Sequence, residues 1–140
     1  MATLATAARA TKRVLIVDDD ESIVRVLHDA LGLFRHDHAY AVETAADGVE
    51  GLAALERGQF DLILLDMYMP RMTGLELLTE IRRRGLQTPV LMLTGNEDNK
   101  SAASALKSGI FAYVPKPFDL QQLEMLVSLA AASRSAGAGA

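Results

Sequence analysis

An unbroken apolar run that ends in an acid constrains the fold of this chain more than any other feature. Residues Leu62 to Leu65 are apolar, and Asp66 follows where the apolar run stops. Such a run is typical of a strand buried on both faces of a parallel sheet. Ligands of open α/β sheets bind outside the carboxyl ends of the strands, so we expect Asp66 at a functional edge. Alone, Asp66 could instead simply open a turn that leads to Pro70.

Strand and helix patterns alternate along the rest of the chain. Apolar runs predict strands at 14–17, 40–42, 62–65, 90–93 and 111–114. Apolar residues at helical spacing follow each of them: Ile23, Val26, Leu27, Ala30, Leu31 and Phe34; Val49, Leu52 and Ala53; Leu77, Leu78 and Ile81; Ala102, Ala105 and Leu106; Leu120, Leu123, Leu126, Val127 and Ala130. Five strands alternating with five helices predict an α/β fold, a doubly wound, mostly parallel sheet with helices on both faces.

Local signals place several helix ends and loops. Asp20 and Thr73 are expected to be N-caps, because a short polar side chain accepts hydrogen bonds from the first free backbone N–H groups. The arginine run 82–84 is expected to form a solvated helix end. The segment 34–39, with two histidines that flank an acid, is expected to be an exposed loop rather than a metal site.

Composition limits the class of protein. A chain of 140 residues with 50% hydrophobic content suits one domain with one substantial core. We expect a disordered leader over 1–11, a folded domain over 12–132 and a disordered tail over 133–140. A net charge of -4 argues against a nucleic-acid surface, and the absence of cysteine excludes disulfides and thiol chemistry. No apolar run approaches the roughly 18 residues that span a bilayer, so we expect a soluble, cytoplasmic protein.

Polar residues gather at the predicted strand ends. The acids at 18–20 follow the first strand, Asp66 the third, Thr94 the fourth and Lys116 the fifth. Carboxylates about 4 Å apart repel by several kcal/mol at an effective dielectric near 20, so such a cluster needs a cation. Oxygen ligands with positions left for water suit Mg²⁺. Each residue could have a structural role alone, but together they indicate a site for phosphoryl chemistry.

These motifs together resemble the receiver domain of bacterial two-component response regulators, with a chemotaxis-regulator-like, single-domain form. The matching stretches, in order along residues 12–132, are Val14-Leu15-Ile16-Val17-Asp18-Asp19, Leu64-Leu65-Asp66-Met67-Tyr68-Met69-Pro70, Leu91-Met92-Leu93-Thr94 and Tyr113-Val114-Pro115-Lys116-Pro117-Phe118. The resemblance implies a flavodoxin-like sheet of strand order 2-1-3-4-5. It also implies a cis Lys116-Pro117 bond.

The resemblance further implies a signalling switch rather than an enzyme with a separate substrate. Asp66 would accept a phosphoryl group from a phosphohistidine on a histidine kinase or histidine phosphotransferase. Mg²⁺ would be held by Asp18, Asp19, Asp66 and the backbone carbonyl of Tyr68. Lys116 would pair with Asp66 and then with the phosphoryl group, to which Thr94 would also donate. Thr94 and Tyr113 would together switch partner binding.

Two other classes of protein are considered. A phosphatase of the haloacid-dehalogenase type needs a second acid two positions after its nucleophile, where this chain has Tyr68. A flavodoxin needs a first loop that cradles phosphate, which the acids at 18–20 would repel. We expect no membrane or nucleic-acid partner. We expect the chain to be a monomer or a weak dimer. The sequence leaves open the cognate kinase, the downstream target, the phosphoryl lifetime and whether the domain stands alone or belongs to a larger regulator or hybrid kinase.

Overall fold

The fold is built on one five-stranded parallel sheet. The computed structural model describes residues 10–34, 38–95 and 109–139. The strands are β1 (Ala10–Val17), β2 (His38–Ala45), β3 (Leu62–Asp66), β4 (Val90–Thr94) and β5 (Ala112–Pro115). Their spatial order is β2-β1-β3-β4-β5, and every neighbouring pair is parallel. The predicted sheet and strand order are therefore confirmed, with β3 at the centre.

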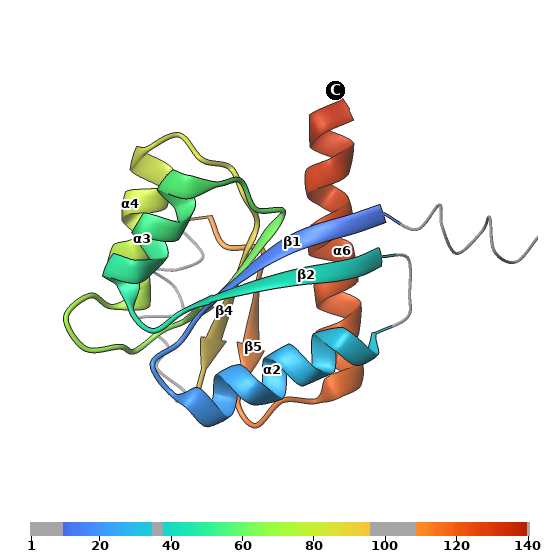
Figure 1. Cartoon of the computed structure of the whole chain (residues 1–140), viewed down its shortest axis with the longest axis horizontal. Helices are drawn as coiled ribbons and strands as arrows, with labels where there is room; N and C mark the ends of the chain where they lie inside the picture. Colours follow the sequence, from blue (N-terminus) through green and yellow to red (C-terminus); the bar gives the residue numbers. More distant parts are fainter. Residues whose placement is uncertain (1–9, 35–37, 96–108, 140) are drawn as a thin grey trace, which may run out of the picture.

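Helices cover both faces of the sheet, as a doubly wound fold requires (Figure 1). The described helices are α2 (Glu21–Leu33), α3 (Gly48–Arg57), α4 (Gly74–Arg83) and α6 (Leu120–Gly139). α3 and α4 lie on one face, and α2 and α6 lie on the other. The helix predicted around 99–108 lies outside the described residues.

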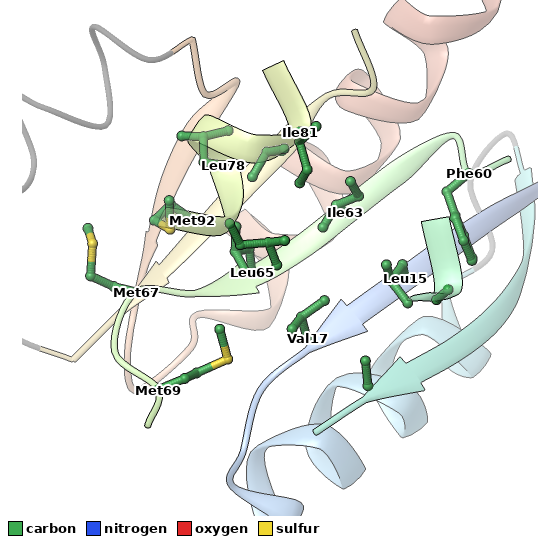
Figure 2. Packing of buried hydrophobic residues seen from close by; sticks show 14 residues of the cluster. Leu15, Val17, Phe60, Ile63, Leu65, Met67, Met69, Leu78, Ile81 and Met92 are labelled. Carbon is green, nitrogen blue, oxygen red and sulfur yellow. The ribbon is translucent and has the colours of Figure 1, made fainter. Parts of the chain in front are cut away.

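Alternation along the strands divides the core into two layers, because successive strand side chains point to opposite faces. The layer under α3 and α4 includes Leu15, Val17, Ile63, Leu65 and Met92 (Figure 2). The layer under α2 and α6 includes Val14, Ile16, Leu62, Leu64 and Leu91. β3 is buried along its whole length and contributes to both layers, which confirms the burial predicted from its apolar run.

Three apolar side chains that helical spacing placed in the core are exposed instead: Val26 of α2, Val49 of α3 and Leu120 of α6. The buried positions of α3 are Gly48, Gly51 and Ala54. These residues lack large side chains, so the helix lies close to the sheet through a face that hydrophobicity does not mark. The prediction for α3 was therefore wrong for Val49, whereas Leu52 of the same predicted face does pack against the core.

Arg82 differs from the solvated helix end predicted for the arginine run. Its guanidinium donates to the carbonyl oxygens of Leu86 and Thr88, each at 2.9 Å, and of Gly109 at 2.8 Å. Burial lowers the pKa of Arg82. The other two arginines of the run are exposed and pair with Glu80, as a solvated end would. Arg82 instead joins the end of α4 to the residues that precede β4 and β5.

His38 also departs from its predicted place in an exposed loop. It begins β2, where it pairs in register with Ala10, and its side chain is buried. Its ring packs edge-on against that of Tyr40, with centroids 6.1 Å apart. The sheet extends further back along the chain than the apolar run suggested, which draws this histidine into it. Ala39 also lies in β2 and Phe34 is the C-cap of α2, whereas residues 35–37 of the predicted loop lie outside the described residues.

The ends of the domain differ from their predicted bounds. β1 begins at Ala10, before the predicted start at residue 12. α6 continues to Gly139, through most of the stretch 133–140 that we expected to be disordered. Residues 1–9 of the predicted leader lie outside the described part.

The start of α4 is held directly against the end of β3. Thr73 is the N-cap, as predicted, and forms a capping box with Glu76. Gly74 follows, and its N–H donates to the carbonyl of Met67 at 2.9 Å. A Cβ atom at Gly74 would lie 2.2 Å from the carbonyl oxygen of Asp66. The close approach of α4 to Asp66 therefore requires glycine.

Gly74→Ala should destabilise the fold by about 3 kcal/mol, because the added methyl group overlaps backbone atoms that cannot move without shifting β3. Gly32→Ala in α2 is the matched control. A Cβ atom there meets nothing within 4 Å, and alanine should stabilise the helix by about 0.5–1 kcal/mol. Urea unfolding followed by circular dichroism measures both. Equal stability of the two variants would show that the start of α4 does not pack closely against the end of β3.

Candidate functional site

The carboxyl edge of the sheet brings together the side chains that the sequence predicted there. Asp18 follows β1, Asp66 and Thr94 end β3 and β4, and Lys116 follows β5. Because the strands are parallel and β1, β3 and β4 are neighbours, these positions share one edge. The predicted site residues thus come from four separate segments of the chain.

Three carboxylates form the centre of this site. Asp18 and Asp66 are only 2% and 5% exposed, whereas Asp19 is exposed. One carboxylate oxygen from each lies within 4.8 Å of the others. A pocket of about 260 Å³ opens beside Asp18 and Asp19 and is also lined by residues of α2, the end of β2 and the start of α3. The cluster is therefore compact and reachable from solvent.

Lys116 supplies the positive charge inside the cluster. Its Nζ lies 3.1 Å from Asp66 Oδ1 and 3.3 Å from Asp18 Oδ2. Its backbone N–H donates to the carbonyl of Thr94 at 2.8 Å, which fixes the loop after β5 to the end of β4. The Lys116-Pro117 peptide bond is cis, as predicted. The lysine is thus held both through its backbone and through its side chain.

Burial and charge act against each other at these groups. Burial raises the pKa of Asp66, and the negative charge of Asp18 raises it further, although Lys116 and the Tyr68 backbone N–H lower it in part. Burial likewise raises the pKa of Asp18. For Lys116, burial alone would lower the pKa, but contacts with Asp66 and Asp18 raise it overall. The site therefore carries more negative charge than one lysine compensates.

The three acids after β1 have different structural roles. Asp20 is the N-cap of α2, as predicted, and accepts from the N–H of Ser22 at 2.9 Å and of Ile23 at 3.4 Å. Asp18 accepts the N–H of Asp20 at 2.9 Å and turns toward Lys116 rather than capping the helix. One cap suffices for α2, so Asp18 and Asp19 are available for the cluster.

The remaining predicted residues surround the cluster. Thr94 is half-buried at the end of β4. Tyr113 of β5 is half-buried and packs against the core layer under α3 and α4. Tyr68 is 44% exposed, and its backbone N–H bonds to the Asp66 carboxylate. The ligand role of its carbonyl remains a prediction.

The sequence did not reveal one contact at the rim of the site. Asp47 caps α3, and it also forms an ion pair with Arg71 of the β3–α4 loop. These residues are far apart in sequence, and neither belongs to a periodic pattern. A positively charged residue after a Met-Pro pair carries no signal for such a contact.

The donor set fits a hard divalent cation. Three carboxylates offer only oxygen ligands and lie close together, and two of them, Asp18 and Asp19, line the pocket. Mg²⁺ takes one or two carboxylates and keeps several waters. The excess negative charge left by Lys116 is the charge that such a cation would neutralise.

Without metal, the buried acids should make stability fall as pH rises. The folded state holds the pKa of Asp18 and Asp66 above the ordinary value of 3.8, so just above that value it binds more protons than the unfolded chain. The contribution of these two groups to the free energy of unfolding therefore decreases as pH rises through that window. Asp66→Asn should weaken this decrease and add on the order of 1 kcal/mol at neutral pH.

Urea unfolding in EDTA across the acidic to neutral range measures this effect. Asp29→Asn is the control, because it removes the same charge from an exposed carboxyl on α2, and it should stay within about 0.5 kcal/mol of the parent. The test is the difference between the parent and Asp66→Asn, because Asp20 and Glu80 have lowered pKa values and make stability rise with pH. An Asp66→Asn protein less stable than the parent at neutral pH, or a difference that does not grow as pH rises, would contradict the electrostatic description of the site.

Comparison with known proteins agrees with this geometry. The sequence-family model of the response regulator receiver domain matches residues 14–128 of this chain. The transcriptional regulatory protein DltR of Streptococcus agalactiae is 35% identical over 79% of this chain and 48% of its own length. Response regulator MprA of Mycobacterium leprae is 38% identical over 79% of this chain and 47% of its own length. This chain thus spans about half the length of these relatives.

Solved structures show the same fold. The chemotaxis protein CheY4 of Vibrio cholerae superposes with a TM-score of 0.76 at 35% identity, over 86% of this chain and 99% of its own. A CheY-like receiver protein of Methanospirillum hungatei superposes with a TM-score of 0.80 at 32% identity, over 91% of this chain and 99% of its own. Among the described helices, none is long and apolar enough to cross a membrane. The chain belongs to the response regulator receiver domain family of two-component signalling.

Proposed function

We propose that this chain is a phosphorylation switch in which Asp66 accepts a phosphoryl group from a phosphohistidine. The observation that supports this most is the position of the Asp66 carboxylate, 3.1 Å from Lys116 and within the three-acid cluster. A nucleophilic carboxylate, a fixed cation and a cluster suited to a divalent metal are the components that phosphoryl transfer requires.

The transfer forms one bond and breaks one. An oxygen of Asp66 attacks the phosphorus while the P–N bond to the donor histidine breaks, and its electron pair stays on the histidine nitrogen. Asp66 becomes an acyl phosphate. Lys116 then pairs with a phosphoryl oxygen, and Thr94 donates to another. A loose transition state needs little beyond positioning and charge neutralisation, so these residues suffice without a separate acid or base.

Asp18, Asp19, Asp66 and the Tyr68 carbonyl would hold Mg²⁺. When bound, the ion neutralises charge on the transferring phosphoryl group and orients it. Asp18 is buried and already bonded to the Asp20 N–H, so it keeps its position with or without an ion. Asp19 is exposed and reaches the cluster from the solvent side.

The donor is proposed to be a histidine kinase or a histidine phosphotransferase, the class of partner that phosphorylates receiver domains. DltR is a transcriptional regulatory protein and CheY4 is a chemotaxis protein, so the family serves different outputs. The family match and Tyr68, in place of a second acid, both disfavour the phosphatase alternative.

A small phosphodonor such as acetyl phosphate, with Mg²⁺, should add one phosphoryl mass to the parent chain. Asp66→Asn should gain none, because the amide is not a nucleophile. Intact-mass spectrometry reads both, and circular dichroism verifies that the variant folds. A panel of phosphorylated histidine kinases then identifies the protein donor. Equal labelling of Asp66→Asn and the parent would place the acceptor elsewhere.

We further propose that Thr94 and Tyr113 convey the phosphorylated state to the surface. Thr94 is the last residue of β4 and pairs with Pro115 in the β4–β5 register, and Tyr113 lies on the same edge strand as Pro115. A hydroxyl drawn toward the phosphoryl group vacates space that the half-buried Tyr113 ring can take. A ligand shifts a conformational equilibrium only by its preference for one state, so the two arrangements must differ by only a few kcal/mol.

Beryllofluoride, which mimics the phosphoryl group, should shift the amide resonances of Tyr113 and Val114 in the parent but not in Thr94→Ala. The reason is that the variant lacks the hydroxyl that links Asp66 to β5. Thr79→Ala is the control, because it removes an exposed hydroxyl on the surface of α4. Shifts at β5 that persist unchanged in Thr94→Ala would rule out this coupling.

A further inference from the structure

The β3–α4 loop, residues 67–73, carries the backbone that faces Asp66. Its ends are fixed: the Met67 N–H donates to the Leu93 carbonyl, and the Gly74 N–H donates to the Met67 carbonyl, each at 2.9 Å. Met67 and Met69 extend the buried layer beyond the end of β3 (Figure 2). Tyr68 lies between them, and its N–H bonds to the Asp66 carboxylate. The position of this loop therefore determines whether the Tyr68 N–H can bond to the Asp66 carboxylate.

Arg71 occupies a backbone conformation that disfavours its own side chain. Its φ of 70° lies in the left-handed region, and among the described residues it is the only non-glycine one with a positive φ. Such a conformation persists only where surrounding contacts determine it, and it is frequent at functional sites. Its guanidinium forms an ion pair with Asp47, whose carboxylate is buried.

Asp47 connects this loop to α3. One carboxylate oxygen accepts the Glu50 N–H at 2.9 Å as the helix N-cap, and the other binds Arg71. The next residue, Gly48, lies against the loop so closely that a Cβ atom there would be 2.6 Å from Met72 Sδ. Buried carboxylates need a charged partner, and Arg71 provides one from the loop. The ion pair thus joins the middle of the loop to the start of α3.

We propose that the Arg71–Asp47 ion pair is a positioning contact for the Asp66 site. It holds the β3–α4 loop against α3, and the loop in turn holds the Tyr68 backbone beside Asp66. Neither Arg71 nor Asp47 touches the reacting atoms, so both act through the loop. The consequence for metal binding rests on the proposed function, whereas the consequence for loop order does not.

Two variants break the ion pair without breaking the fold. Arg71→Gly suits the left-handed backbone and removes the cation. Asp47→Asn keeps a good helix N-cap and removes the anion. Their direct electrostatic effects on Mg²⁺ are opposite: loss of a cation favours Mg²⁺ binding, and loss of an anion disfavours it. Displacement of the loop should weaken Mg²⁺ binding in both, by roughly tenfold, the lower end of what outer-shell changes cost.

Titration calorimetry with Mg²⁺ alone measures the affinities. Arg57→Ala is the matched control, because it removes an exposed arginine from the opposite end of α3, and it should leave the affinity unchanged. Weaker binding in both test variants supports the proposal. Tighter Mg²⁺ binding by Arg71→Gly together with weaker binding by Asp47→Asn would mean that the two residues act only through their charges at long range. That result would overturn the proposal.

Amide hydrogen exchange tests the loop without metal. The Tyr68 amide should exchange roughly fivefold faster in both variants, the scale of one lost ion pair, while the Leu64 amide in β3 should be unchanged. Equal acceleration at both amides would indicate general destabilisation, and no acceleration at Tyr68 would overturn the proposal. If the parent binds no Mg²⁺, the metal assignment fails, and hydrogen exchange alone decides the positioning role.

Discussion

The proposed site depends on the burial of like charges at one edge of a sheet. Asp18 and Asp66 are almost fully buried next to each other, an arrangement that raises the pKa of both and disfavours their charged forms. Lys116 compensates in part, from 3.1 Å and 3.3 Å. A sheet with β3 between β1 and β4 is what makes this possible, because the strands bring acids from distant parts of the chain to the same edge. The residual negative charge is what a bound cation would neutralise.

Thr94 links the two proposed functions of this edge. Its carbonyl accepts the backbone N–H of Lys116, so the residue proposed to respond to phosphorylation also anchors the lysine that would bind the phosphoryl group. β5 is an edge strand, joined to the sheet on one side only by β4. A change at Thr94 therefore has a short covalent and hydrogen-bonded route to Tyr113 and to the outer edge of the sheet.

The sequence predicted the features that depend on the pattern of apolar residues and on local hydrogen bonding. The apolar runs correctly indicated the strands, and the caps Asp20 and Thr73 follow from local hydrogen bonding that their side chains can make alone. The gathering of Asp18, Asp66 and Lys116 followed from parallel strands, since their ends must share an edge. Their assigned roles as nucleophile, ligands and switch came from the resemblance to receiver domains rather than from periodicity, and those roles are still proposals.

The sequence could not predict contacts between distant segments. The conformational preferences of the residues involved give no signal for such contacts, or a misleading one. Arg82 lies in a run that is typical of a solvated helix end, yet its guanidinium satisfies three carbonyls. Arg71 adopts a backbone that costs a non-glycine residue on the order of 1–3 kcal/mol. Both become favourable only once the core has placed their partners. The two buried layers are therefore what allow the carboxyl edge to hold repelling acids and a strained loop, in a fold of typical stability of about 5–15 kcal/mol.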